Sequence, residues 1–202
     1  MQKHFRISEN FWFSNKLACH LPLAKCAHIV YKLNTKKYIE TKMAMRMHKF
    51  RLYPRKDIEQ KMLDTLDLCR QTYNELLGLL NEQKEIDKAQ LQGIIPNMKI
   101  CDSRYKQLYS KTMQYECYRL FSNLTALVQT KKKSRKVGGL RFKGKGWFKT
   151  FSYNQSGFKI IPTGRRHQIL RLSKIGEIPI RCHREIKGKI KQVTVKKEAS
   201  GK

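Results

Sequence analysis

The stretch that decides the fold is HKFRLYPRKDIEQKMLDTLDLCRQTYNELLGLL, residues 48–80. In residues 48–53 Phe50 and Leu52 alternate with polar and aromatic side chains, a period of two that indicates a β-strand. Pro54 ends this pattern. Beyond it, apolar residues recur every three or four positions, which is typical of one face of a long helix. These positions are Ile58, Met62, Leu66, Cys69, Tyr73, Leu76, Leu77 and Leu80. The stretch therefore predicts a strand that leads directly into a helix.

A second helical stripe follows after a break in the pattern. Gly93 and Pro96 interrupt the apolar spacing, so we expect a loop that runs to about Asp102. A short helix is expected around residues 103–109. Helical spacing then returns at Met113, Cys117, Leu120, Phe121, Leu124, Leu127 and Val128. We expect the two long helices to pack as an antiparallel pair.

After Gly139 the sequence becomes typical of β-structure. Short segments rich in Ile, Val, Phe and Tyr are separated by Gly and Pro about every ten residues. They are residues 149–153, 158–161, 168–172, 178–182 and 190–196. This spacing predicts small antiparallel strands that close into a barrel. The strand at 48–53 is expected to join them, so the predicted fold class is α+β, with a helical insertion within a small antiparallel β-barrel.

Positive charge is concentrated in one part of the chain. The protein has 202 residues, 44 Lys and Arg against 15 Asp and Glu, and a formal net charge of +29. Residues 117–176 contain fifteen Lys or Arg and no acid, whereas residues 54–90 contain eight acids and six bases. Repulsion among unpaired cations opposes compaction unless a polyanion neutralises them, and nucleic acid offers both phosphates and bases. A generally basic, ribosome-like protein is the less specific interpretation.

Other functional classes are not favoured. No run reaches the roughly 18 apolar residues of a transmembrane helix, and the nearest, residues 17–31, is interrupted by His and Lys. The six cysteines lack a C-x-x-C pair, so a zinc module is not expected within the chain. We expect reduced thiols, no cofactor or metal in this chain, no membrane partner and a cytoplasmic, nucleoid-associated location. The oligomeric state cannot be read from the sequence.

Four landmarks, in this order, resemble the TnpB (OrfB) family, which insertion sequences encode and whose members have long been labelled transposases. They are HKFRLYP (48–54), CRQTYN (69–74), RFKGKG (141–146) with FSYNQSGF (151–158), and LSKIGEI (172–178) followed by GKI (188–190). The resemblance covers about residues 47–202. It implies an OB-like, wedge-type barrel split by a helical recognition-type domain. Its first strand would be residues 45–54, the helical domain 55–136, and the rest of the barrel 137–198.

The resemblance also implies a function. Full-length relatives resemble RNA-guided DNA endonucleases, in which the helices and barrel hold a guide RNA and read a short motif beside the target. A RuvC-like nuclease with a zinc ribbon cuts the DNA. This chain ends at Lys202, about where the first RuvC strand is expected, and after Glu116 its only acids are Glu177, Glu185 and Glu198. Two-metal cleavage needs several converging carboxylates.

We therefore expect a truncated protein without a RuvC domain or catalytic site, which binds guide RNA and target DNA. Mg²⁺ and Zn²⁺ are expected only in the missing C-terminal part. Residues 1–44 are interpreted either as an over-long gene model upstream of the Met43–Met47 cluster or as a genuine ordered extension, with no function assigned.

The residues expected to contact nucleic acid follow from chemistry and motif position. Arg51 and Tyr53 belong to the RLYP motif, and Arg70 and Asn74 lie on the first helix, where Tyr73 is expected in the core. Phosphate contacts are expected from Lys131, Lys132, Lys133, Arg135 and Lys136. The guide-RNA side of the wedge is expected to include Arg141, Lys143, Lys145, Trp147 and Lys149.

Two of these residues have alternative interpretations. Gln114 is a candidate for reading an adenine edge, because an amide donates and accepts at once, but a solvated side chain is the favoured alternative. Trp147 is expected either to stack on an unpaired base or to be buried in the barrel.

Two other functions stay open. One is a stand-alone basic regulator that binds DNA through a helix-turn-helix. The two apolar stripes are separated by about thirty residues, far more than the short turn of that motif, which argues against it. The other is a decayed remnant without function.

Overall fold

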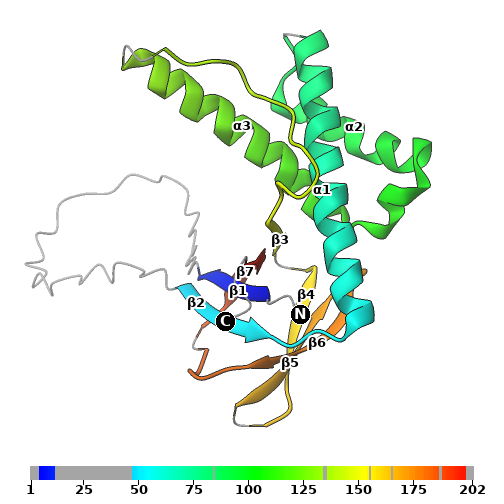
Figure 1. Cartoon of the computed structure of the whole chain (residues 1–202), viewed down its shortest axis with the longest axis vertical. Helices are drawn as coiled ribbons and strands as arrows, with labels where there is room; N and C mark the ends of the chain where they lie inside the picture. The colour runs from blue at the N-terminus through cyan, green and yellow to red at the C-terminus, as the bar shows by residue number, and fades with distance from the viewer. Residues whose placement is uncertain are drawn as a thin grey trace, which may run out of the picture.

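The computed structural model describes residues 5–11, 47–83, 85–133, 136–154, 156–164, 166–186 and 188–198. These residues form an α+β fold, in which α-helices stand beside one curled antiparallel sheet (Figure 1). The helices are α1 (Lys56–Glu82), α2 (Lys88–Cys101) and α3 (Ser110–Lys132), with a 3₁₀ turn η1 (Ser103–Gln107) before α3. The strands are β1 (Phe5–Phe11), β2 (Met47–Leu52), β3 (Thr150–Asn154), β4 (Phe158–Pro162), β5 (His167–Leu172), β6 (Gly176–Arg181) and β7 (Ile190–Lys197).

The sheet joins the strand before the helices to the strands after them. Its order is β3-β7-β1-β2-β6-β5-β4, and every neighbouring pair is antiparallel. The pairing of β2 with β6 confirms that the helices are an insertion within one sheet. The order ends at β3 and β4, so the described strands form a curled half-barrel where the sequence predicted a closed barrel. Strand β1 lies between β2 and β7, in a segment for which no strand was predicted.

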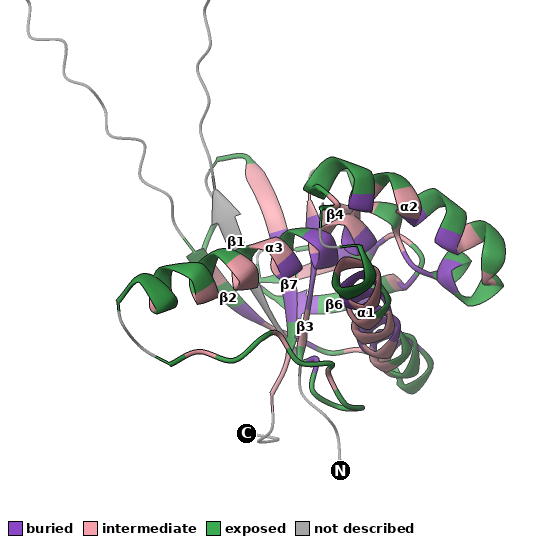
Figure 2. Ribbon diagram, turned by 90° about the horizontal axis from the view of Figure 1, so that it is seen from above, coloured by how far each residue is buried: buried purple, intermediate pink, exposed green. Residues whose placement is uncertain are grey.

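The inner face of the sheet follows the predicted alternation. Ile178 and Ile180 on β6 and Val193 and Val195 on β7 are buried. Figure 2 shows that buried positions gather where α1, α3 and the sheet meet, whereas the far end of α3 is exposed. The hydrophobic core is therefore shared between the helices and the sheet.

Helix α1 forms as predicted because its apolar stripe is removed from water. Met62, Cys69, Tyr73 and Leu76 are fully buried, and burying a large apolar side chain contributes about 1.5–3 kcal/mol. Acidic residues in the first turn of α1 favour the positive end of its dipole. The helix contacts α3, η1, β3 and β6. It therefore links the helical part of the protein to the sheet.

Helix α2 corrects the prediction of a loop to about Asp102. The Asp87 carboxylate accepts a hydrogen bond from the Gln90 backbone N–H (2.6 Å), and the Gln90 side chain accepts one from the Asp87 N–H (2.9 Å). This capping box starts the helix, and Leu91, Ile95 and Met98 bury one face of it. A proline inside a helix costs about 3 kcal/mol. Here the cap and the buried face offset that cost.

The direction of the two long helices also differs from the prediction. Cys69 of α1 lies beside Glu116 of α3, and Asn123 of α3 donates a hydrogen bond to the Tyr73 hydroxyl of α1 (3.4 Å). Contacts advance along both helices together, so α1 and α3 run in the same general direction. The predicted antiparallel pairing was wrong because α2, which the sequence pattern missed, carries the chain back between them.

We predict that Gly157→Ala destabilises the fold. A methyl group at Gly157 would lie 2.5 Å from ring atoms of both Tyr109 and Tyr153, two rings that stack 5.4 Å apart. Overpacking of this kind typically costs about 1–3 kcal/mol, which urea unfolding would measure as a lower free energy of unfolding. Gly164→Ala is the matched control, because no atom lies within 4 Å of its added methyl group. Equal stability of the two variants would contradict the packing described here.

Candidate nucleic-acid interface

The densest positive charge lies on the end of α3 and on the segment that follows it. We call residues 136–149, which connect α3 to β3, the basic loop. Figure 1 shows α3 projecting away from the sheet and the basic loop returning from its tip to α1. No acid occurs in residues 131–149. The exposed cations are Lys131, Lys132, Lys133, Lys136, Arg141, Lys145 and Lys149.

Two polar side chains of α1 hold the backbone of the basic loop. Asn74 donates from Nδ2 to the Lys143 carbonyl (2.9 Å) and accepts from the Lys143 N–H through Oδ1 (2.8 Å). The Arg70 guanidinium donates to the same carbonyl (3.2 Å) and to Asp67 Oδ1 (2.8 Å). The hydrogen bond from Arg70 keeps the pKa of Asp67 below its ordinary value. Arg70 and Asn74, predicted to contact nucleic acid, are thus placed to position the loop.

The loop presents the rings of Phe142 and Trp147 to solvent and buries that of Phe148. Trp147 is 68% exposed, and Lys143 Nζ lies 5.3 Å from its ring centroid. Phe148 packs against Tyr73, with ring centroids 5.7 Å apart. Gly146, in the turn just before Trp147 and Phe148, adopts φ of +81°, a conformation that favours glycine. Trp147 is therefore not buried in the barrel, and its ring is exposed, as the base-stacking interpretation requires.

The other predicted residues are spread over the fold. Arg51 and Tyr53 lie at the junction of β2 and α1, with the Arg51 guanidinium 5.5 Å from the Tyr53 ring centroid. Gln114 is half-buried on α3. Arg135 lies outside the described residues. Of the predicted residues, the structure brings Arg70 and Asn74 together with the basic loop. The nucleic-acid contacts of all the predicted residues stay predictions.

Buried Glu116 and half-buried Arg119, which the sequence analysis did not select, lie together where α3 meets the sheet. Arg119 Nη1 lies 3.2 Å from Glu116 Oε2, and Arg119 Nη2 donates to the carbonyl and hydroxyl of Thr150 (both 3.1 Å). Its guanidinium also lies 4.7 Å from the Phe148 ring centroid. Burial raises the pKa of Glu116 to about 8, although the charge of Arg119 opposes the shift. The i, i+3 spacing of Glu116 and Arg119 was the available sequence signal.

The described residues show neither a metal-ligand cluster nor a membrane-spanning helix. In the ranges that the structure covers, no group of three or more His, Cys, Asp or Glu is arranged to hold a metal ion. None of the helices in those ranges has the length and apolar character of a membrane span.

Comparison with known families gives one match. Residues 43–87 match the helix-turn-helix domain model of OrfB proteins from IS605-type elements. The matched region includes β2, α1 and the connection to the N-cap of α2. It contains the HKFRLYP and CRQTYN landmarks and confirms the resemblance drawn from them. No curated protein matches the chain significantly.

The structure also removes the spacing objection to a helix-turn-helix. That objection compared the stripes of α1 and α3, because α2 was predicted to be a loop. Helix α1 ends at Glu82 and α2 begins at Lys88, so only a short connection joins them.

We predict that Asn74→Ala loosens the basic loop. The substitution removes both hydrogen bonds to the Lys143 peptide and leaves its N–H without that partner. We expect a loss of about 1–2 kcal/mol in stability and faster hydrogen exchange at the Lys143 amide. Gln71→Ala is the control, because Gln71 bonds only to Asp67 on the same helix in the contacts described. An unchanged rate of hydrogen exchange at Lys143 in Asn74→Ala would show that these two hydrogen bonds do not hold the loop.

We predict that stability falls as the pH rises from about 5 to 8. Over this range folded Glu116 retains a proton that the unfolded chain has lost, because burial raises its pKa from 4.5 to about 8. Raising the pH therefore favours unfolding, by up to about 1.4 kcal/mol per pH unit. Chemical unfolding at several pH values would measure the slope. Glu116→Gln should flatten it, whereas the surface change Glu177→Gln should not; the same slope in both variants would refute the assignment.

Proposed function

We infer from the match over residues 43–87 that this chain carries the N-terminal region of the TnpB (OrfB) family, and we propose that it is a DNA-binding, transposase-like protein. The observation that supports this most is the cationic segment 131–149, whose loop is held to α1 by three hydrogen bonds. A surface held in place in this way loses little conformational entropy when it binds phosphates.

We propose that the same surface binds guide RNA. Phosphates of either nucleic acid suit the exposed lysines, but an exposed indole also stacks on unpaired bases, which RNA loops and single strands provide. Trp147, with Lys143 beside it, is the residue that favours a single-stranded segment. In this proposal the curled sheet is the wedge-type, OB-like part and the helices are the recognition-type part.

We further propose that the chain binds without cutting and needs neither Mg²⁺ nor Zn²⁺ to do so. The support is the scarcity of acids after Glu116, where only three occur. Phosphodiester cleavage by metal ions requires several carboxylates around them. Binding to nucleic acid would place the protein with the nucleoid.

A second candidate is a regulator that binds duplex DNA through α1 and α2. The family description and the short α1–α2 connection favour it. However, α2 has only two cations, and both make intramolecular contacts. Lys99 Nζ donates to the Leu108 carbonyl (2.6 Å) and to Ser110 Oγ (2.8 Å), and Lys88 Nζ lies 4.0 Å from the Tyr118 ring centroid. The basic loop is therefore the better phosphate-binding surface.

We predict a steep salt dependence of binding. If five or more phosphates are contacted, the logarithm of the affinity should fall with the logarithm of salt concentration at a slope of about −4 or steeper. Changing Lys131, Lys132 and Lys133 together to Ala should make the slope shallower by about 2 to 3. Fluorescence anisotropy with single-stranded RNA and with duplex DNA would measure both. A control replaces Lys56 and Lys61, which are exposed on α1, a helix with six acids and three bases.

The outcomes separate the candidates. Trp147→Ala should weaken single-stranded RNA binding by about 1–3 kcal/mol and affect duplex binding less. A flat salt response, or equal losses in the control, would refute the electrostatic proposal. Tight binding to one duplex sequence that the loop variants leave unchanged would favour the α1–α2 regulator. Nicking of target DNA in the presence of RNA and Mg²⁺ would refute the proposal that the chain does not cut.

A further inference from the structure

The face of the sheet that is turned away from the core has a side-chain pattern of its own. Side chains alternate between the two faces of a strand, and residues directly opposite each other on neighbouring strands share a face. Leu52 of β2 and Ile180 of β6 are buried and mark the inner face. Their neighbours Arg51 and Arg181 therefore lie on the opposite face, which we call the outer face.

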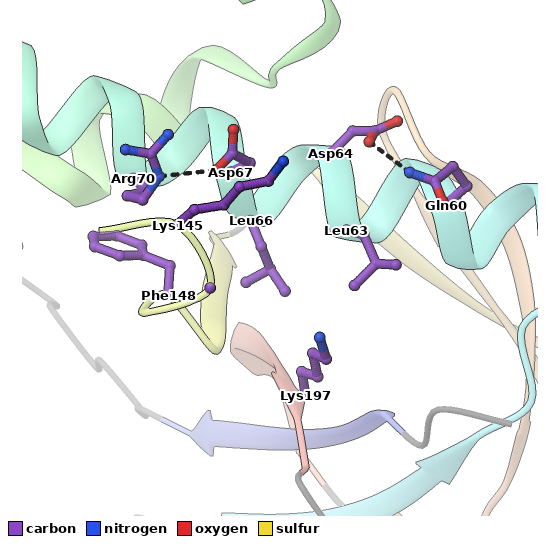
Figure 3. Close-up of a pocket in the computed structure, with 10 residues that line it drawn as sticks. Gln60, Leu63, Asp64, Leu66, Asp67, Arg70, Lys145, Phe148 and Lys197 are labelled. Atoms are coloured by element: carbon purple, nitrogen blue, oxygen red, sulfur yellow. Dashed lines mark hydrogen bonds and ion pairs between the residues drawn. The ribbon is translucent and has the colours of Figure 1, made fainter. Parts of the chain in front are cut away.

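Strand β7 has the same two faces. Figure 3 shows Lys197, at the end of β7, pointing toward α1 and lining the cleft beside the basic loop. Lys196, the preceding residue, is exposed and lies on the outer face. The cleft drawn in Figure 3 and the outer face are therefore on opposite sides of β7.

The register of the sheet places basic residues side by side on the outer face. Arg51 is opposite Arg181, and Arg181 is opposite His167 of β5. In the register the same row continues through position Arg6 of β1 to Lys196. Neighbouring strands lie about 4.8 Å apart, so the row is close-spaced. Among the described strands no acid occupies a position in this row, and we call Lys196, Arg51, Arg181 and His167 the basic row.

Like charges face each other in the basic row, in contrast to a cross-strand ion pair elsewhere on the same face. Arg171 Nη2 lies 2.9 Å from Glu177 Oε1, directly across the β5–β6 pair. Opposite charges in such a position stabilise a sheet, whereas like charges such as Arg51 and Arg181 destabilise it. A bound polyanion relieves that repulsion. The basic row therefore suits a run of phosphates.

An apolar row runs beside the basic row. The Tyr53 N–H donates to the Pro179 carbonyl (2.9 Å), Pro179 is opposite Ile169, and Ile169 is opposite Ile161. Tyr53 is 45% exposed and Pro179 is exposed. The two rows are two residues apart along each strand, which is about 7 Å. The Arg51 guanidinium, 5.5 Å from the Tyr53 ring centroid, connects them.

The two rows together match the chemistry of a single strand. Each nucleotide carries a phosphate, which suits lysine and arginine, and a flat base, which stacks on aromatic rings. In a single strand the bases are free to turn toward an aromatic side chain, whereas a duplex keeps them paired inside the helix. The exposed Tyr53 ring and its apolar neighbours therefore favour a single strand over a duplex.

We propose that the outer face of the sheet binds a single-stranded nucleic acid, with phosphates along the basic row and an unpaired base on Tyr53. The proposal rests on the proposed function, because it takes nucleic acid as the partner. It adds a second binding surface, which is formed by the strands and does not include the basic loop.

The first test measures the contribution of the basic row to the salt dependence of binding. Fluorescence anisotropy on the full chain would compare an RNA single strand, the DNA strand of the same sequence and duplex DNA. Changing Arg181 and Lys196 together to Ala should make the salt slope on both single strands shallower by about 1.4, since each phosphate contact on a single strand contributes about 0.7.

The matched control replaces Lys56 and Lys61 of α1, which removes the same charge from exposed positions outside the sheet. It should leave the slope nearly unchanged. Equal slopes in the wild-type chain and in the Arg181, Lys196 variant would overturn the proposal. A loss on duplex DNA as large as that on the single strands would contradict the preference for a single strand.

The second test concerns the aromatic ring. Tyr53→Ala should weaken binding of either single strand by about 5- to 150-fold, the range expected for loss of one stacked base, without changing the salt slope. Tyr53→Phe keeps the ring and should bind like the wild-type chain. Wild-type affinity in Tyr53→Ala would refute the stacking contact, and thermal unfolding would verify that each variant is folded.

A third measurement locates the bound strand without any substitution. Backbone amide chemical shifts of the full chain would be followed while a short oligouridine is added. Shifts should change in β2, β5 and β6, whose residues form both rows. Changes confined to residues 136–149 would place the strand on the basic loop alone and overturn the proposal.

The same measurements separate this proposal from the proposed function on which it rests. A chain that binds single-stranded RNA with a steep salt slope, but whose slope and affinity are unaffected by changes in the two rows, retains the proposed function and loses the outer-face site. A chain that binds no nucleic acid loses both.

Discussion

Burial of the apolar stripe of α1 is the interaction on which the rest of the structure depends. Near the start of the helix, Ile58 packs so closely on the first residue of β6 that a methyl group at Gly176 would lie 2.9 Å from it. Farther along, Cys69 lies beside Glu116 of α3, and Tyr73 packs on Phe148 of the basic loop. One helix therefore supports the sheet, the second long helix and the charged loop. At about 1.5–3 kcal/mol for each large buried side chain, this stripe outweighs any surface ion pair in the molecule.

The same helix turns a repulsive stretch of sequence into an ordered surface. Cations in residues 131–149 have no acid within that stretch to neutralise them. Hydrogen bonds from Asn74 and Arg70 to the Lys143 peptide hold the loop, and the side chain of Phe148 is buried. The charges themselves stay in water, where salt weakens their mutual repulsion. The cations therefore remain available for a polyanion.

Helix α2 shows that helix-breaking residues alone do not determine where a helix forms. Gly93 and Pro96 predict a loop when each is considered alone. The capping box at Asp87 and Gln90 and the buried triplet Leu91, Ile95 and Met98 act together, and their combined free energy exceeds the local cost. With α2 in place, the chain reverses between α1 and α3, so the two long helices run in the same general direction. The matched helix-turn-helix region leads into this short α1–α2 connection.

Sequence alone determined what depends on local periodicity. The alternation in β2, β6 and β7, the stripes of α1 and α3, and the burial of Tyr73 follow from periods of two and 3.6 residues, because these decide which side chains face water. Only the tertiary structure decided which distant groups meet. The pairing of Asn74 with Lys143, the contact of Arg119 with Thr150, the exposure of Trp147, the central place of β1 and the open edges of the sheet all depend on partners far away in the chain. The sequence around a polar side chain is the same whether that side chain binds a ligand or the protein backbone. Arg70 and Asn74 could therefore be selected from the sequence, but the sequence could not show which group they bind.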